Sequence, residues 1–129
     1  MIAIDTNVVV RFLVDDDHEQ FRRAQQVIAK APVFISNTVL LECEWVLRSV
    51  YEYEPRDFVE AFRNFAGLEK VTLEDPELAA TALKWHEQGM DFADALHLAG
   101  SAGCAAFLTF DRRLASAPVR VGAIPVRAP

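Results

Sequence analysis

The sequence has few cysteines and no long apolar run, and each shortage excludes a class of protein. Its two cysteines and three histidines are scattered over 129 residues and show no zinc-binding spacing. Cys43 and Cys104 lie in apolar helical patterns, which predicts buried free thiols suited to a reducing cytosol. No apolar run reaches the roughly 20 residues that span a bilayer, and Asp5 breaks the only candidate signal segment. We therefore expect a cytoplasmic protein without membrane contact.

Basic charge is also scarce. The net charge is −6 and the pI is about 5.0, whereas a protein that binds nucleic acid by charge alone is usually basic. This weighs against a non-catalytic nucleic-acid-binding module. It does not exclude a metal-dependent nuclease, whose acidic site adds negative charge that the metal offsets.

Apolar stretches alternate between strand and helix patterns along the chain. A composition that is 52% hydrophobic is enough for one folded domain over residues 1–129. Alternating strands and helices predict an α/β fold, with three layers (α/β/α) around a central parallel sheet of four or five strands. The predicted strands are residues 1–5, 33–36, 70–73 and 106–110, with a short fifth at 119–121. The predicted helices are 8–13, 18–30, a helix capped by Asn37 or Thr38 that runs to Tyr51, 56–66, 76–88 and 92–102, then a helical turn at 111–115. Residues 125–129 are expected to be a loose end.

Carboxylates stand at the ends of two predicted strands. Asp5 follows the first strand and Asp111 follows the fourth, so both belong to the carboxyl edge where open parallel sheets bind ligands. Either residue alone is also a common turn or helix cap. Carboxylates gathered at one edge repel one another unless they are protonated or neutralised by a cation. A divalent-metal site is therefore our first hypothesis.

Two glutamates on the helix that ends at Tyr51 have different surroundings. Glu42 borders the predicted buried arc and has Val46, not a basic residue, four positions on. Glu44 lies on the opposite border with Arg48 at i+4, the usual spacing of a solvated surface pair. Glu42 is therefore the better ligand candidate.

The helix predicted from Phe92 opens with two further acids. Asp91 and Asp94 form Asp-x-x-Asp, and for Asp91 a helix cap is the favoured interpretation. Asp94 lies one turn inside the helix and can point back toward the strand ends. His97 shares its polar arc and can hydrogen-bond Asp94, although a lone helical histidine is more often structural.

The order of these fragments resembles the PIN-domain family, and within it the VapC-type toxins of toxin–antitoxin pairs. The matching fragments are Ile4-Asp5-Thr6-Asn7, then Ser36, Leu41-Glu42, Asp94-Ala95-Leu96-His97-Leu98-Ala99 and Leu108-Thr109-Phe110-Asp111. The resemblance implies an acidic quartet with supporting hydrogen-bonding residues and Asp91 as a possible fifth acid. The implied quartet is Asp5, Glu42, Asp94 and Asp111, and the implied supporting residues are Thr6, Asn7, Ser36 and Thr109.

The resemblance also implies an activity and partners. Relatives are endoribonucleases that hydrolyse RNA phosphodiesters with Mg²⁺ or Mn²⁺, hard cations that prefer carboxylate oxygens and can activate a bound water. They are typically homodimers held in check by a small antitoxin. Leu41 and Trp45, predicted on the helix arc opposite the core, suit such an interface, although packing under another helix of the same chain explains them equally well.

Two other function classes compete with this expectation. A non-catalytic PIN-like scaffold that binds RNA or protein is disfavoured because the set of acids is complete. An aspartate-based phosphotransferase of the haloacid-dehalogenase type needs Asp-x-Asp, and here Asn7 stands at the second position after Asp5. A receiver-like switch needs a strand-end lysine that the sequence does not place.

Overall fold

The strands form two separate parallel sheets in the computed structural model, which describes residues 1–118 and 120–129. β1 (Ile2–Ala3), β2 (Val33–Ile35) and β3 (Val71–Leu73) form one sheet in that order, with Ile2 opposite Val33 and Val33 opposite Val71. β4 (Phe107–Leu108) pairs with β5 (Val126–Arg127) in the second sheet. The mixed α/β class with a parallel sheet is therefore confirmed.

The predicted number of strands in the central sheet was wrong. The sheet that contains β1 has three strands, not four or five, because within the described residues β4 pairs with β5 and not with β1. The expectation of a loose end at 125–129 was wrong for Val126–Arg127, which form β5. Of the strand expected at 119–121, Val119 lies outside the described residues, and residues 120 and 121 are not in a strand.

The described residues form seven helices, most of them opened by an acidic or hydroxyl side chain. Asp17, Ser36, Asp75 and Asp91 each accept a hydrogen bond from a backbone N–H of the first helical turn, at 3.1 to 3.3 Å. Pro55 and Pro76 occupy first helical positions, where no backbone N–H is needed. The bounds are α1 (Thr6–Leu13), α2 (His18–Lys30), α3 (Asn37–Tyr51), α4 (Pro55–Ala66), α5 (Pro76–Glu87), α6 (Phe92–Ala99) and α7 (Arg112–Ala115).

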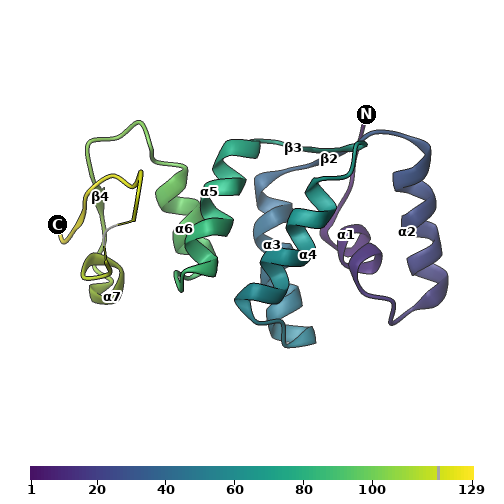
Figure 1. Ribbon diagram of the computed structural model, residues 1–129, viewed down its shortest axis with the longest axis horizontal. Coiled ribbons are helices and arrows are strands. Elements are labelled where there is room, and N and C mark those ends of the chain that lie inside the picture. The colour runs from purple at the N-terminus through teal and green to yellow at the C-terminus, as the bar shows by residue number, and fades with distance from the viewer. Residues whose placement is uncertain (119) are drawn as a thin grey trace.

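The elements follow one another across the molecule in three groups (Figure 1). The three-stranded sheet lies with α1 to α4 in one half, and α5 and α6 occupy the middle. α7 and β4 lie at the opposite end, where the chain also terminates. Asp5 therefore belongs to one half and Asp111 to the other end.

An aromatic cluster joins α4 to α5 and α6. The Phe58 ring lies 5.2 Å from Phe92, 5.6 Å from Phe62 and 6.1 Å from His86, measured between ring centroids. His86 is itself buried, and its Nδ1 lies 2.8 Å from the Met90 carbonyl oxygen. Because Phe92 is the first residue of α6, this cluster fixes the start of the helix that carries Asp94.

The burial of the two glutamates on α3 is the reverse of the expectation. Glu44 is 3% exposed and Glu42 is exposed, because the buried face of α3 contains Leu40, Cys43 and Leu47 and therefore includes Glu44. The Glu44 carboxylate accepts a hydrogen bond of 2.8 Å from Arg48 Nε. The pair is therefore a buried acid with a half-exposed basic partner, not a solvated surface pair.

Replacing Arg48 with methionine is expected to lower the free energy of unfolding by about 1–3 kcal/mol, because the Glu44 carboxylate then stays buried without its charged donor. Arg63→Met is the matched control. Its pair with Glu87 is 49% and 46% exposed, so its loss should be below about 1 kcal/mol. Denaturant unfolding measures both, and equal losses would contradict a special role for the buried acid.

Candidate functional site

Three aspartates line one pocket between α6, α7 and the segment after α7. We name it the acid pocket; its volume is about 550 Å³ and its lining includes Asp91, Asp94, Asp111, Arg113 and Arg120. Gly89 follows the C-terminal cap of α5 and begins the turn that leads to Asp91; its φ of 110° is a conformation that L side chains rarely adopt. Two of the predicted quartet, Asp94 and Asp111, and the possible fifth acid, Asp91, are therefore brought together.

Local hydrogen bonds fix the backbone that carries these acids. Asp91 accepts from the Asp94 backbone N–H at 3.2 Å, as the cap of α6. Asp111 caps α7 by accepting from the Arg113 backbone N–H at 2.9 Å. The Thr109 hydroxyl oxygen accepts the Asp111 backbone N–H at 3.0 Å, which fits the supporting role expected for this threonine. Asp91 and Asp111 thus each cap a helix and also line the acid pocket.

The charges in the acid pocket act on one another. Burial raises the pKa of Asp94, and the nearby carboxylates of Asp91 and Asp111 raise it further, while His97 and Arg113 oppose the shift. His97 is exposed, so it acts on Asp94 from the solvent side of α6. A carboxyl group whose ionisation is opposed by two neighbouring acids is the arrangement that a bound cation stabilises.

The other two acids of the expected quartet, Asp5 and Glu42, are not in the lining of the acid pocket, and their charges act on Cys43. Burial raises the pKa of the Cys43 thiol to about 12, with smaller contributions from the charges of Glu42 and Asp5. Asp5 caps α1 by accepting the Thr6 backbone N–H at 2.7 Å. The Thr6 hydroxyl is buried without a hydrogen-bond partner in the described part of the chain. Neither Asp5 nor Glu42 lines the acid pocket.

The division of the acids follows from the strand pairing. Asp111 follows β4, and β4 pairs with β5 and not with β1, so Asp111 is not held beside Asp5 by a shared sheet edge. Among the described residues no group of three or more histidines, cysteines, aspartates and glutamates has an arrangement that could hold a metal ion. The donor chemistry of the acid pocket fits a hard divalent cation. In the present geometry the described residues do not gather three such donors around one point.

The remaining expected residues have structural contacts. Ser36 caps α3 by accepting the Val39 backbone N–H at 3.3 Å, and its hydroxyl lies 3.1 Å from that of Thr38. Asn7 lines a different pocket, between α1 and α2, together with Arg11. Both residues are near the ends of elements that carry a predicted acid, but neither lines the acid pocket.

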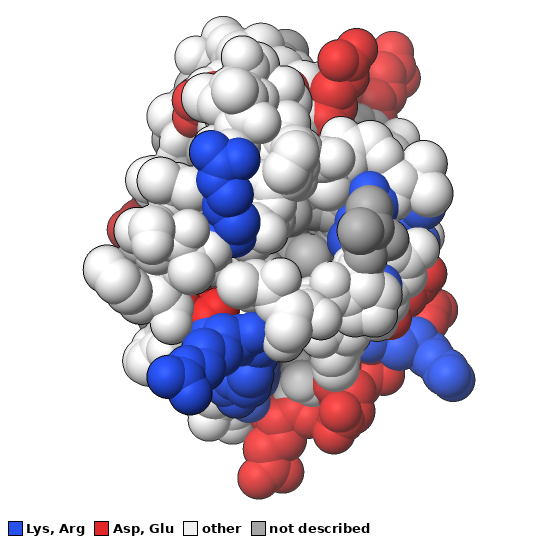
Figure 2. All heavy atoms as spheres, turned by 90° about the vertical axis from the view of Figure 1, so that its left-hand side faces the viewer, with Lys and Arg blue, Asp and Glu red and all other residues white. Residues whose placement is uncertain are grey.

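Sequence reasoning did not assign either arginine of the acid pocket to the site. Arg113 and Arg120 stand in a stretch, residues 101–129, that contains four arginines and one aspartate in a chain whose net charge is −6. This local excess of basic residues was the available signal. Figure 2 shows basic side chains on several sides of this end of the molecule.

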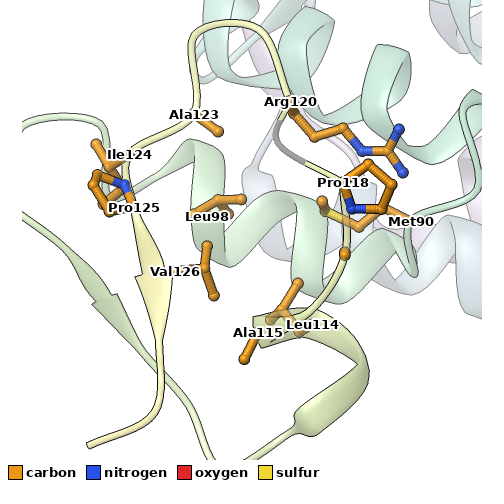
Figure 3. A pocket seen from close by; sticks show the side chains of 11 residues that line it. Met90, Leu98, Leu114, Ala115, Pro118, Arg120, Ala123, Ile124, Pro125 and Val126 are labelled. Atoms are coloured by element: carbon orange, nitrogen blue, oxygen red, sulfur yellow. The ribbon is translucent and has the colours of Figure 1, made fainter.

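A second, apolar cavity lies beside the acid pocket. Its volume is about 250 Å³, and Met90, Leu114, Ala117 and Arg120 line both spaces. Figure 3 shows the Arg120 side chain beside Pro118 and Met90, across the cavity from Val126. Arg120 therefore belongs to the boundary between an apolar cavity and the acid pocket.

The two cysteines should differ sharply in reactivity. Cys43 is fully buried with a pKa of about 12, whereas Cys104 is exposed, contrary to the expectation that both are buried. Because the thiolate is the reactive form, we expect Ellman's reagent at pH 8 to modify one thiol quickly and the other only on unfolding. Cys104→Ser should remove the fast phase and Cys43→Ser should leave it. Two fast phases in the native protein would contradict the burial of Cys43.

No helix of the described residues has the length and apolar character to cross a membrane.

A comparison with curated proteins found no match. A family model of the PIN domain matches residues 2–119, which includes all five acids and Arg113. PIN domains are generally nucleases that use divalent metals. The match covers most of the sequence, and this chain therefore belongs to the PIN domain family.

Proposed function

We propose that this protein is a cytoplasmic Mg²⁺- or Mn²⁺-dependent endoribonuclease. The observation that supports this best is the acid pocket, in which burial, and then the charges of two neighbouring carboxylates, raise the pKa of Asp94. Such a site favours a divalent cation and, through it, a phosphodiester. RNA is the substrate class that the sequence resemblance implies.

Asp94 and Asp111 are the residues proposed to hold the metal in the acid pocket, with Asp91 beside them. Asp5, the cap of α1, and Glu42, on α3, complete the proposed acidic set. A divalent metal held there would lower the pKa of a bound water and would offset the negative charge of the phosphodiester. The Thr109 hydroxyl oxygen accepts the Asp111 backbone N–H and so orients Asp111, while Thr6, Asn7 and Ser36 support the elements that carry Asp5 and Glu42.

We further propose that the chain acts as the toxin of a toxin–antitoxin pair and forms a homodimer. Trp45 on α3 is 56% exposed, and Leu41 beside it is only partly buried. A large apolar side chain in that position suits an interface with a second copy of the chain. The antitoxin, in this proposal, covers the acids and places a basic residue against them. Light scattering tests the dimer: a monomer at micromolar concentration, without antitoxin, would contradict it.

The proposed activity is tested with purified protein and RNA. We expect cleavage of single-stranded RNA in Mg²⁺ or Mn²⁺, loss of cleavage in EDTA, and recovery when the metal is restored. Product ends and cuts within circular RNA separate an endonuclease from an exonuclease. A protein that leaves RNA intact under all metal conditions would reject the proposal.

A non-catalytic scaffold is the second candidate, and one observation favours it. No three donors of the described residues are arranged to hold a metal ion. A scaffold of this kind would bind RNA or a protein with the same affinity in EDTA and in Mg²⁺, and it would cut nothing. The metal-dependence experiment therefore decides between the two candidates.

A further inference from the structure

Arg120 makes weak contacts for a partly buried arginine. Its Nε is buried without a hydrogen-bond partner in the described part of the chain. Its terminal nitrogens reach Gln88 only at 3.5 Å to the side-chain oxygen and 3.4 Å to the backbone carbonyl. Good N–H···O bonds measure about 2.7–3.2 Å, so within the described residues the guanidinium donates only these two long bonds. The described residues therefore satisfy few of the five N–H donors of the Arg120 guanidinium.

Arg113 reaches the same pocket with more freedom. Its side chain is 95% exposed, and its Nε lies 3.9 Å from an Asp111 carboxylate oxygen. That distance is too long for a hydrogen bond, so the ion pair leaves the guanidinium donors open to another acceptor. The acid pocket thus contains three aspartates and two incompletely bonded arginines.

Opposite charges in one open pocket indicate two kinds of ligand group. The carboxylates suit a cation, while guanidinium groups bind phosphate through paired N–H donors. The surrounding stretch, residues 101–129, is basic within an acidic chain. A strand of RNA placed over this end would meet arginines here, whereas the chain as a whole repels it.

We propose that Arg120, together with Arg113, binds a backbone phosphate of single-stranded RNA next to the phosphate that is cleaved. Arg120 is thus a positioning residue that sets where the strand lies relative to Asp94 and Asp111. The proposal rests on the proposed ribonuclease function. It gives a role to the terminal N–H donors of Arg120, which make only long bonds to Gln88.

The test measures steady-state cleavage of a fluorescent single-stranded RNA in Mg²⁺ for the wild type, Arg120→Gln, Arg120→Lys and Arg113→Gln. Arg22→Gln, on the exposed face of α2, is the charge-matched control. We expect Arg120→Gln to raise KM about tenfold, with a smaller change in kcat, because a charge-assisted contact to the bound strand is lost. Arg120→Lys should recover part of the loss, since lysine binds phosphate as a point charge.

Salt dependence separates a phosphate contact from a structural role. Between 50 and 200 mM KCl, the slope of log(1/KM) against log salt should become less steep by about 0.7 for each lost phosphate contact to a single strand. Arg22→Gln should keep the wild-type slope. A variant that only loosened the fold would lower the melting temperature and leave the slope unchanged.

The outcomes separate this proposal from the function on which it rests. If the wild type cleaves RNA but the arginine variants keep its KM and salt slope, the positioning role is rejected and the nuclease stands. If the wild type does not cleave RNA in any metal, both fail. Should Arg120→Gln unfold at the assay temperature, Arg120→Lys and Arg113→Gln decide, and unchanged values in both would overturn the proposal.

Discussion

Replacing Asp94 with asparagine is expected to lower the rate of RNA cleavage by about two orders of magnitude or more, because a bound metal contributes several kcal/mol of charge stabilisation in such reactions. The substitution keeps the shape of the side chain and removes its charge. Asp94 is the residue of choice because burial and two neighbouring carboxylates already raise its pKa. Cleavage of RNA under saturating Mg²⁺ is the measurement.

The same substitution should leave the metal-free protein equally stable or more stable at neutral pH. The folded-state pKa of Asp94 is raised, so the native state holds this proton more tightly than the unfolded chain does. Stability is therefore lost as the pH rises from the unfolded pKa, about 3.9, through the raised folded value. Because asparagine does not titrate, the free energy of unfolding of the Asp94→Asn variant should change less with pH over that range.

Metal titration completes this test. The melting temperature of the wild type should rise with added Mg²⁺ or Mn²⁺, since a ligand that binds only the native state stabilises it, and that of Asp94→Asn should rise clearly less. Glu60→Gln, an exposed acid on α4, is the control and should respond as the wild type does. Equal responses of all three proteins would show that Asp94 is not a metal ligand.

The substitution Asp5→Asn tests whether Asp5 acts in catalysis together with the acids of the acid pocket. The charge of Asp5 acts on Cys43, and Asp5 does not line the acid pocket. If its substitution abolishes cleavage as Asp94→Asn does, Asp5 works with the acid pocket during catalysis. If cleavage stays normal, Asp5 is only the cap of α1, and the active acids are those of the pocket.

Most helices were predictable from local residues alone. Proline at the start of α5 and acids before α2, α5 and α6 are signals that act within one turn, and the helices begin within two residues of the expected positions. Strand pairing was not predictable in this way. β4 and β5 are two residues each, and a stretch as short as Val126–Arg127 carries no periodicity that would distinguish a strand from a loose end.

The candidate site was predictable only in part, for the same reason. Asp94 and Asp111 were expected together and line one pocket, since each is fixed by a local cap next to α6 or α7. Their relation to Asp5 depends on long-range pairing of β4, which a single sequence does not specify. The burial of Glu44 was missed because a helical wheel identifies a face but not which helix covers it.

Replacing Phe58 with alanine is expected to cause the largest loss of stability, about 3–5 kcal/mol, because a buried phenyl ring leaves a cavity that rigid neighbours fill poorly. Phe58 is 2% exposed and packs against Phe92 and His86 with ring-centroid distances of 5.2 and 6.1 Å. For a chain of this size the melting temperature should fall by about 10–15 °C. Thermal and denaturant unfolding both measure it.

Phe110→Ala provides the matched control, since the same ring at 88% exposure has little packing to lose. Its effect should stay within about 0.5 kcal/mol. Phe58→Leu should fall between the two, because most of the apolar volume is kept. The cluster also fixes the start of α6, so Phe58→Leu should slow RNA cleavage at temperatures where it is fully folded, through looser placement of Asp94. If Phe58→Ala and Phe110→Ala destabilise the protein equally, the aromatic cluster does not hold α4 against α5 and α6, and another contact must position the acid pocket.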